Sequence, residues 1–265
     1  SRDLRGALAT PRVTHYGSII EPAKVGELLR AIDGYEGFGI TRQALQIAAH
    51  TFVRPGELRW AEWREIDLEA CVWSIPAEKM KMRKAHHVPL SRQAVALFED
   101  LRSITGYSGY AFPSVRSRSR PMSENTMNSG LRRLGYRSEE MTAHGFRAMA
   151  STLLNESGEW SSDAIERSLA HGDRDRVRAA YHRGAHWKER VEMAQWWSDY
   201  LDQMREDVPT KANCGEPRMT ATAFSLSVPY CTFVRPSTNA LSPATGISVM
   251  VPTLTAAISP SEMSS

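Results

Sequence analysis

The stretch TAHGFRAMASTLL, residues 142–154, predicts the clearest helix in this chain. Phe146 and Met149 recur at helical spacing and belong to an apolar face that can pack into a core. His144 and Arg147 lie one turn apart on another face, which we expect the helix to present rather than bury. The same helix therefore combines packing with an H-x-x-R pair that can transfer protons and hold an anion.

Two further stretches carry residues of the same chemical kind. LAHGDRDRVRAAYHRG, residues 169–184, places Tyr181 ten residues after His171, and FVRPGEL carries Arg54 and Glu57. Arginine forks can hold phosphate oxygens, histidines can transfer protons, and a tyrosine can attack phosphorus. Each fragment alone is weak, because a lone H-x-x-R pair is more often an ordinary solvated pair. Together they predict phosphodiester chemistry.

Composition describes a globular chain with a small excess of basic residues. With 265 residues and 42% hydrophobic residues, the chain is long enough for one good core. A net charge of +3 argues only weakly for a polyanionic partner, so that case depends on local clusters of arginine. One cluster is SVRSRSRP and another surrounds the tyrosine; a solvated charged face is the alternative interpretation.

The sequence carries no sign of a metal site, a disulfide or a membrane segment. Its three cysteines lack metal-ligand spacing, and Cys71 lies in a strand-like run where a small buried thiol is the default. His86 and His87 should point to opposite faces of a strand, which is poor for joint metal binding. No apolar run is long enough to cross a bilayer, and the first residues show no charged-then-apolar signal pattern. We therefore expect a cytoplasmic protein without a membrane partner.

Periodicity predicts a mainly α fold with a small antiparallel β-sheet, of the α+β class. Helices are expected from Pro22, from Thr41 to the Arg54-Pro55 step, from Pro55, and after the caps Ser91, Ser123 and Ser161 or Ser162. The runs IDLEACVWSIP and AHHVPLS have a period of two, and they predict two strands joined by the basic loop AEKMKMRK. A last long helix carries a stripe expected to be core or subunit contact: Trp187, Val191, Ala194, Trp197, Leu201 and Met204.

In their order along the chain, R-x-x-E-L, the lysine hairpin, H-x-x-R, L-x-H and the tyrosine resemble the tyrosine recombinases, or phage-type integrases. The likeness is greatest to integrases of satellite phages and genomic islands, and it runs from about residue 1 to residue 206. It implies a tyrosine recombinase catalytic-domain fold over residues 21–206. Residues 1–20 would be a linker from a preceding DNA-binding part. The Pro/Ser/Thr-rich tail, 207–265, departs from the family pattern and is expected to be disordered.

The resemblance also implies the roles of the reactive groups. Tyr181 would be the nucleophile and would form a 3′-phosphotyrosyl bond without a metal or other cofactor. Arg54 and Arg147 would hold the phosphate oxygens, with His171 as a further contact. His144 would accept the tyrosine proton.

Two supporting roles depend on position in the sequence. Lysine would protonate the leaving 5′ oxygen, and counting back from the V-P-L string, as the family places it, selects Lys81 rather than Lys79 or Lys84. Glu57 would hold either the imidazole of His144 or the guanidinium of Arg54.

The expected partners are double-stranded DNA attachment sites in the bacterial nucleoid. The resemblance implies a tetramer on paired sites, a monomer without DNA, and integration or excision of a mobile element. Five arginines are expected to contact DNA: Arg116, Arg118, Arg120, Arg176 and Arg178. A DNA-relaxing topoisomerase-like enzyme and a non-enzymatic DNA-binding remnant of a mobile element stay open as alternatives.

Overall fold

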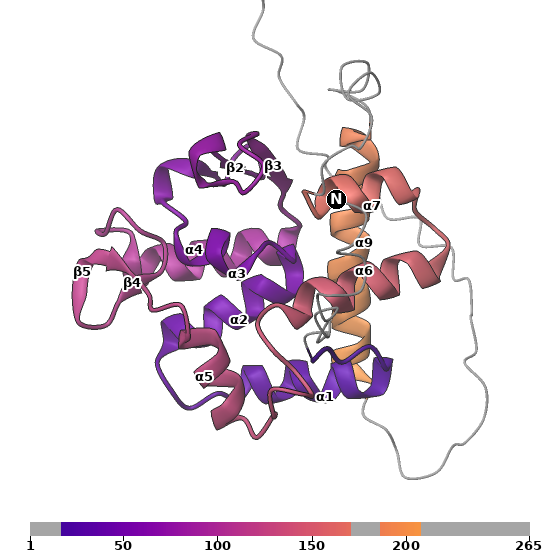
Figure 1. Ribbon diagram of the computed structural model, residues 1–265, viewed down its shortest axis with the longest axis horizontal. Helices are drawn as coiled ribbons and strands as arrows, with labels where there is room; N and C mark the ends of the chain where they lie inside the picture. The colour runs from indigo at the N-terminus through magenta and orange to yellow at the C-terminus, as the bar shows by residue number, and fades with distance from the viewer. Residues whose placement is uncertain (1–16, 171–185, 208–265) are drawn as a thin grey trace, which may run out of the picture. The chain divides into compact units, whose positions relative to one another are not determined.

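Helix α2, Gly39–Thr51, lies among the other helices of the computed structural model, which describes residues 17–170 and 186–207 (Figure 1). Its side chains Ala44, Leu45 and Ile47 are fully buried. Helices that contact it include α1 (Pro22–Asp33), α4 (Arg92–Thr105), α5 (Thr126–Arg133), α6 (Gly145–Ser157) and α9 (Trp187–Glu206). The predicted α+β fold class is confirmed, and its core is built around α2.

Helix α2 ends earlier than the sequence indicated. Its last residue is Thr51, and Phe52 follows with a φ of 40°, in the left-handed region. The Phe52 amide donates to Ala48 O, which satisfies one of the last helical carbonyls. The helix therefore ends through a left-handed residue, before the Arg54-Pro55 step begins the short helix α3 (Pro55–Arg59).

Serine side chains cap the starts of two other helices in the described part of the chain. Ser91 Oγ accepts from Ala94 N at the start of α4, and Ser161 Oγ accepts from Ala164 N at the start of α7 (Ser162–Ser168). The prediction that Ser123 caps a helix was wrong. Helix α5 begins after Asn125 without a side-chain cap, and only the backbone carbonyl of Ser123 accepts, from Thr126 N.

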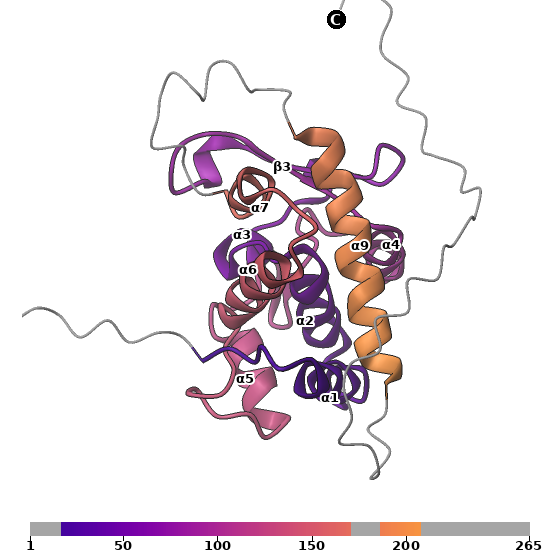
Figure 2. The same ribbon diagram turned by 90° about the vertical axis from the view of Figure 1, so that its right-hand side faces the viewer.

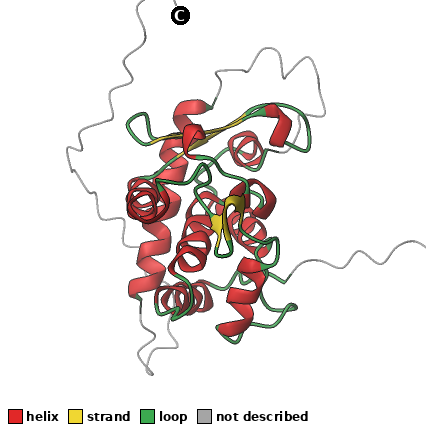
Figure 3. Ribbon diagram, turned by 90° about the vertical axis from the view of Figure 1, so that its left-hand side faces the viewer, coloured by secondary structure: helices red, strands yellow, loops and turns green. Residues whose placement is uncertain are grey.

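The sheet consists of three short antiparallel strands, drawn in yellow at the top of Figure 3. They are β1 (Ile66–Asp67), β2 (Val72–Ile75) and β3 (His86–Pro89), in that order. The pairing of β2 with β3 confirms the predicted strands and their basic connection. His86 is buried and His87 exposed, as the strand period requires.

Cys71 departs from its predicted place in a strand. It lies in the turn between β1 and β2 with a φ of 54°, and its side chain is half-buried. A tight turn joins the two strands there, because Asp67 pairs with Val72. A second pair of strands, β4 (Pro113–Ser114) and β5 (Ser117–Pro121), was not predicted.

Helix α9 runs along one side of the other helices and contacts α1, α2, α4 and α7 (Figure 2). Trp197, Leu201 and Met204 are buried as predicted. Val191 is not, since 42% of it is exposed, and the buried residues of that turn are Arg190 and Met193. The helix therefore brings a charged side chain into the interior.

The described residues belong to one compact unit. Residues 17 and 18, just before α1, form hydrogen bonds with residues 142 and 145, near the start of α6. Ser18 Oγ donates to Gly145 O at 3.0 Å, and Thr142 N donates to Gly17 O at 3.1 Å. In the described ranges, no helix is both long enough and apolar enough to cross a membrane.

Candidate active site

An open groove of about 530 Å³ is lined by residues from four separate parts of the sequence. It brings together Arg54 at the start of α3, Lys81 between β2 and β3, and His144 at the start of α6. These three were predicted as site residues, and they line the same groove. The other lining residues are Pro55, Gly56, Glu57, Arg59, Trp60, Lys79, Glu124, Asn125, Asn128, Thr142 and Ala143.

Arg54 is held by a buried carboxylate in its own helix turn. Its Nη1 donates to Glu57 Oε1 at 2.7 Å, and its backbone amide donates to Glu57 Oε2 at 2.9 Å. Pro55 follows as the first residue of α3, where its missing N–H costs nothing. Of the two predicted partners of Glu57, the structure displays the contact with the Arg54 guanidinium.

Arg147 is buried, contrary to the expectation that its helix face is presented. Only 5% of the residue is exposed. Its Nη1 donates to Phe52 O at 2.8 Å and its Nη2 donates to Leu169 O at 2.6 Å. Burial, with a smaller contribution from Arg54, lowers the pKa of Arg147 to about 10, so the group stays charged at neutral pH. Three of its five N–H donors are not used by these two bonds.

His144 occupies the residue before the first turn of α6 and is half-buried. Burial lowers its pKa below the ordinary value, and the nearby Arg147 and Arg54 guanidinium groups lower the pKa further. The imidazole is therefore mainly neutral at neutral pH. A neutral imidazole can accept a proton, as the predicted role requires.

The three lysines of the hairpin lie in different environments. Lys79 Nζ forms ion pairs with Glu62 at 2.7 Å and with Glu65, and it also donates to Trp60 O. Lys81 is exposed and lines the groove, whereas Lys84 is exposed and does not line it. These positions favour Lys81 as the lysine that can reach a ligand in the groove.

Four of the predicted residues lie outside the described ranges: His171, Tyr181, Arg176 and Arg178. The chain just before them is described. Ala170 has a φ of 50°, and its carbonyl accepts from Arg54 Nη2 at 3.2 Å. Both arginines of the predicted pair therefore donate to backbone carbonyls at the end of α7, immediately before His171.

Arg116, Arg118 and Arg120 are exposed on the β4–β5 hairpin. Arg118 and Arg120 alternate with a serine on β5, which places them on one face of the strand. The Arg118 guanidinium stacks over Tyr107, 4.5 Å from the ring centre. None of the three lines the groove, so any contact they make with DNA would be outside it.

Sequence reasoning missed four residues beside this site. Phe52 and Ala170 are left-handed although neither is glycine, which costs free energy and is often found at functional sites. His86 and Arg190 are buried close by. Burial lowers the pKa of His86 to about 3, with further lowering by Arg190, Arg147 and Arg54. Their identities carried no signal, because left-handed backbone and buried cations depend on contacts distant in sequence.

Metal binding has no support among residues 17–170 and 186–207, where no cluster of three His, Cys, Asp or Glu side chains could hold an ion. The groove is instead lined by cationic and amide side chains, including Arg59, Lys81 and Asn128. Cations and amides suit an anionic ligand.

Two solved structures share this fold. The integrase from mycobacterium phage Brujita aligns with a TM-score of 0.53 and 15% identity, over 74% of this chain and 65% of that one. The Tn1549 transposon integrase, in complex with transposon right end DNA, aligns with a TM-score of 0.52 and 17% identity, over 72% of this chain and 69% of that one. At these identities the likeness concerns the fold alone.

The sequence comparisons show the family of the chain as well as its fold. The integrase of Enterobacteria phage P4 is 44% identical over 217 residues, which is 77% of this chain and 49% of that relative. This chain thus spans about half the length of the relatives that it matches. The sequence model described as "Phage integrase family" matches residues 19–186, more than half of the chain. The chain belongs to the phage integrase family.

Proposed function

We propose that residues 21–206 are the catalytic domain of a site-specific DNA recombinase, which cleaves and rejoins DNA to integrate or excise a mobile element. The main observation behind this proposal is that Arg54, Lys81 and His144, far apart in sequence, line one groove. Arg147 is hydrogen-bonded to the Phe52 carbonyl, two residues before Arg54. A cationic groove suits a phosphodiester, and membership of the integrase family supports DNA as the substrate.

The reaction proposed for this groove needs no group beyond the protein and DNA. The Tyr181 hydroxyl attacks phosphorus, its proton passes to neutral His144, and a 3′-phosphotyrosyl bond forms. The bond from phosphorus to the 5′ oxygen breaks, and Lys81 gives that oxygen a proton. Arg54 and Arg147 stabilise the added negative charge on the phosphate oxygens, with His171 as a further donor. Rejoining reverses each step.

The proposed partner is double-stranded DNA carrying an attachment site, on which the whole protein acts as a tetramer with two paired sites. The Tn1549 relative in complex with transposon end DNA supports such a partner. The exposed arginines Arg116, Arg118 and Arg120, together with Arg176 and Arg178, would contact the DNA backbone. Affinity for DNA should therefore fall steeply as salt is added.

A nicked suicide substrate tests the proposed reaction class. The chain should form a covalent adduct with the 3′ phosphate at the cleavage site, detected as a shifted protein band. Tyr181→Phe should bind the same DNA with unchanged affinity and form no adduct, because only the hydroxyl is lost. An adduct that persists in Tyr181→Phe would place the nucleophile elsewhere.

Sulfur substitution tests the role of Lys81. A substrate with sulfur at the bridging 5′ position expels a thiolate, which needs little protonation near neutral pH. Lys81→Ala should be nearly inactive on ordinary DNA and recover on the sulfur substrate. Lys84→Ala is the matched control and should stay active on both. Lys79→Ala is a poor control, because Lys79 is ion-paired with Glu62 and Glu65.

A further inference from the structure

The turn that ends α7, residues 168–170, accepts hydrogen bonds from both arginines of the proposed site. Arg147 Nη2 donates to Leu169 O at 2.6 Å, and Arg54 Nη2 donates to Ala170 O at 3.2 Å. The first bond joins residues 22 positions apart in sequence, and the second joins residues 116 positions apart. The positions of both guanidinium groups therefore depend on where this turn lies.

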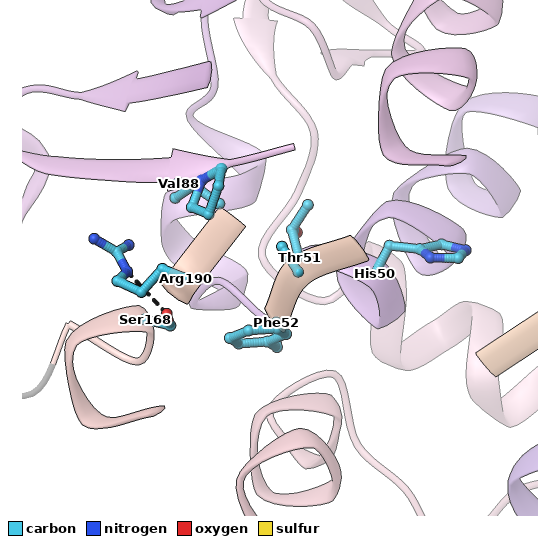
Figure 4. Close-up of a pocket in the computed structure, with 8 residues that line it drawn as sticks. His50, Thr51, Phe52, Val88, Ser168 and Arg190 are labelled. Atoms are coloured by element: carbon cyan, nitrogen blue, oxygen red, sulfur yellow. Dashed lines mark hydrogen bonds between the residues drawn. The ribbon is translucent and has the colours of Figure 1, made fainter. Parts of the chain in front are cut away.

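Arg190 holds this turn in place from a different helix. Its Nε donates to Ser168 Oγ at 2.9 Å, the bond drawn as a dashed line in Figure 4. Its Nη2 donates to His87 O at 2.6 Å. Ser168 ends α7, His87 lies on β3 and Arg190 lies in the first turn of α9. One guanidinium thus joins three elements beside the arginine pair.

Core packing alone does not account for an arginine here. Only 8% of Arg190 is exposed, and none of the ion pairs found between described residues involves it. Burial lowers the pKa of Arg190 to about 10. Burial of a cation is costly, and an apolar side chain of similar volume is often favoured by packing. The directional bonds to Ser168 and His87 are what an apolar side chain could not supply.

We propose that Arg190 is a positioning residue of the recombinase site. It holds residues 168–170 against β3, and through the carbonyls of Leu169 and Ala170 it keeps Arg147 and Arg54 where they bind the scissile phosphate. Arg190 does not line the groove, so it acts through the other two arginines. This inference rests on the proposed function.

The test compares two substrates with different charge at the scissile phosphate. In a methylphosphonate, a methyl group replaces one charged oxygen, so the transition state carries one negative charge fewer and depends less on the arginine pair. The measured quantity is the rate of covalent adduct formation at saturating nicked DNA. Arg190→Met is the main variant. Arg205→Met is its matched control, because Arg205 lies on the same helix and contacts Asp33 and Asp202.

Arg190→Met should lower the rate on the phosphate substrate by about tenfold or more, because the charge-stabilising donors are misplaced. On the methylphosphonate, its loss relative to the parent should shrink to about threefold or less. Arg205→Met should stay within about twofold of the parent on both substrates. Such a charge-selective loss is not expected from a general weakening of the fold.

Three outcomes would overturn the inference. If Arg190→Met matches the parent on the phosphate substrate, or loses the same factor on both substrates, Arg190 does not act through the arginine pair. If the parent chain forms no adduct, the proposed function fails and this inference fails with it. Thermal unfolding shows whether Arg190→Met folds. If it does not, Arg190→Lys is measured, since it keeps the charge but loses the planar fork, and the same selective loss is required.

Discussion

Arg54 and Arg147 carry the same charge but are held in different ways. Arg54 is paired with the carboxylate of Glu57, which is itself 5% exposed. Arg147 donates to two carbonyls and is buried. The Arg54–Glu57 pair carries no net charge, whereas the neutral carbonyls leave the full positive charge of Arg147 in the site. Arg54 should therefore respond to changes in its carboxylate partner as well as to movement of the Ala170 carbonyl, whereas Arg147 should respond to changes in the backbone around it.

Glu57→Gln should slow covalent adduct formation at saturating DNA by about tenfold, which corresponds to about 1.4 kcal/mol in the barrier. The substitution keeps the size of the side chain but removes the charge that orients Arg54. Glu69→Gln, at an exposed position in the turn between β1 and β2, is the control and should leave the rate unchanged. A normal rate for Glu57→Gln would mean that Arg54 is positioned without the ion pair.

The pKa of His144 can be measured by NMR titration of its imidazole. Its midpoint should lie below about 6.5, because burial and two nearby guanidinium groups disfavour the charged form. Arg54→Met removes one of these cations and should raise the midpoint. Arg64→Met, which removes an exposed guanidinium paired with Glu62, should not change it. A midpoint that is insensitive to Arg54 would contradict the close coupling of the two groups.

At the scale of elements, two helices that begin with the same kind of serine cap differ in what the cap also holds. Ser91 Oγ accepts from Ala94 N in α4 and from Ser198 Oγ in α9, and the residue is 4% exposed. Ser161 Oγ accepts from Ala164 N at the exposed start of α7. The side chain of the first cap therefore also joins two helices, whereas the side-chain bond of the second stays within α7, and only the Ser161 backbone amide reaches α9, at Glu189 Oε1.

Ser91→Ala should destabilise the protein by about 2 kcal/mol, because it removes a cap and an acceptor for a buried hydroxyl. Ser161→Ala should cost about 1 kcal/mol or less, as expected for an exposed cap. Urea unfolding of both variants at one pH gives the comparison. Equal costs would indicate that the bond between Ser91 and Ser198 contributes nothing to stability.

At the scale of the whole molecule, His50 links α2 to α9 in the interior. The residue is 7% exposed, and its Nδ1 lies 2.9 Å from Ser198 Oγ, which donates to Ser91 Oγ. Burial lowers the pKa of His50 to about 4, partly opposed by Asp202. His50 also lines a small cavity near Arg190 (Figure 4). The folded protein therefore holds the His50 imidazole in its neutral form.

Acid should destabilise the fold through this histidine. Its folded pKa lies below the unfolded value of about 6.5, so its contribution is complete above that pH and is lost as the pH falls toward about 4. Between pH 7.5 and 5, the expected loss is about 2 kcal/mol from this group. His86 should add to the loss in the same direction.

Urea unfolding at pH 7.5 and at pH 5 tests whether His50 causes this loss of stability. His50→Asn keeps a hydrogen-bonding group near Ser198 and removes the titration, so its stability should depend less on pH than that of the parent. His87→Asn, at an exposed histidine bonded to Ser74, should keep the pH dependence of the parent. An unchanged pH dependence in His50→Asn would mean that other groups cause the acid loss.

The sequence alone determined the features that depend on local periodicity. Apolar spacing predicted α1, α6 and α9 near their observed ends, and alternation predicted β2 and β3. These patterns are readable because neighbours along one element share its burial. The order of motifs also predicted the family, and the strand count selected Lys81, which lines the groove. Those inferences need only residues that are close in sequence, or motifs that occur in a characteristic order along the chain.

The tertiary structure decided which charged side chains are buried and what holds them. Arg147 was expected on a presented face, yet it is enclosed by carbonyls 95 residues before it and 22 residues after it. Val191 was expected in the core or at a subunit contact, but it is exposed, and the neighbouring Arg190 is buried because Ser168 and His87 supply acceptors. A charge is tolerated inside a protein only where distant segments bring it hydrogen-bond partners. No local pattern records those partners, so only the folded chain reveals them.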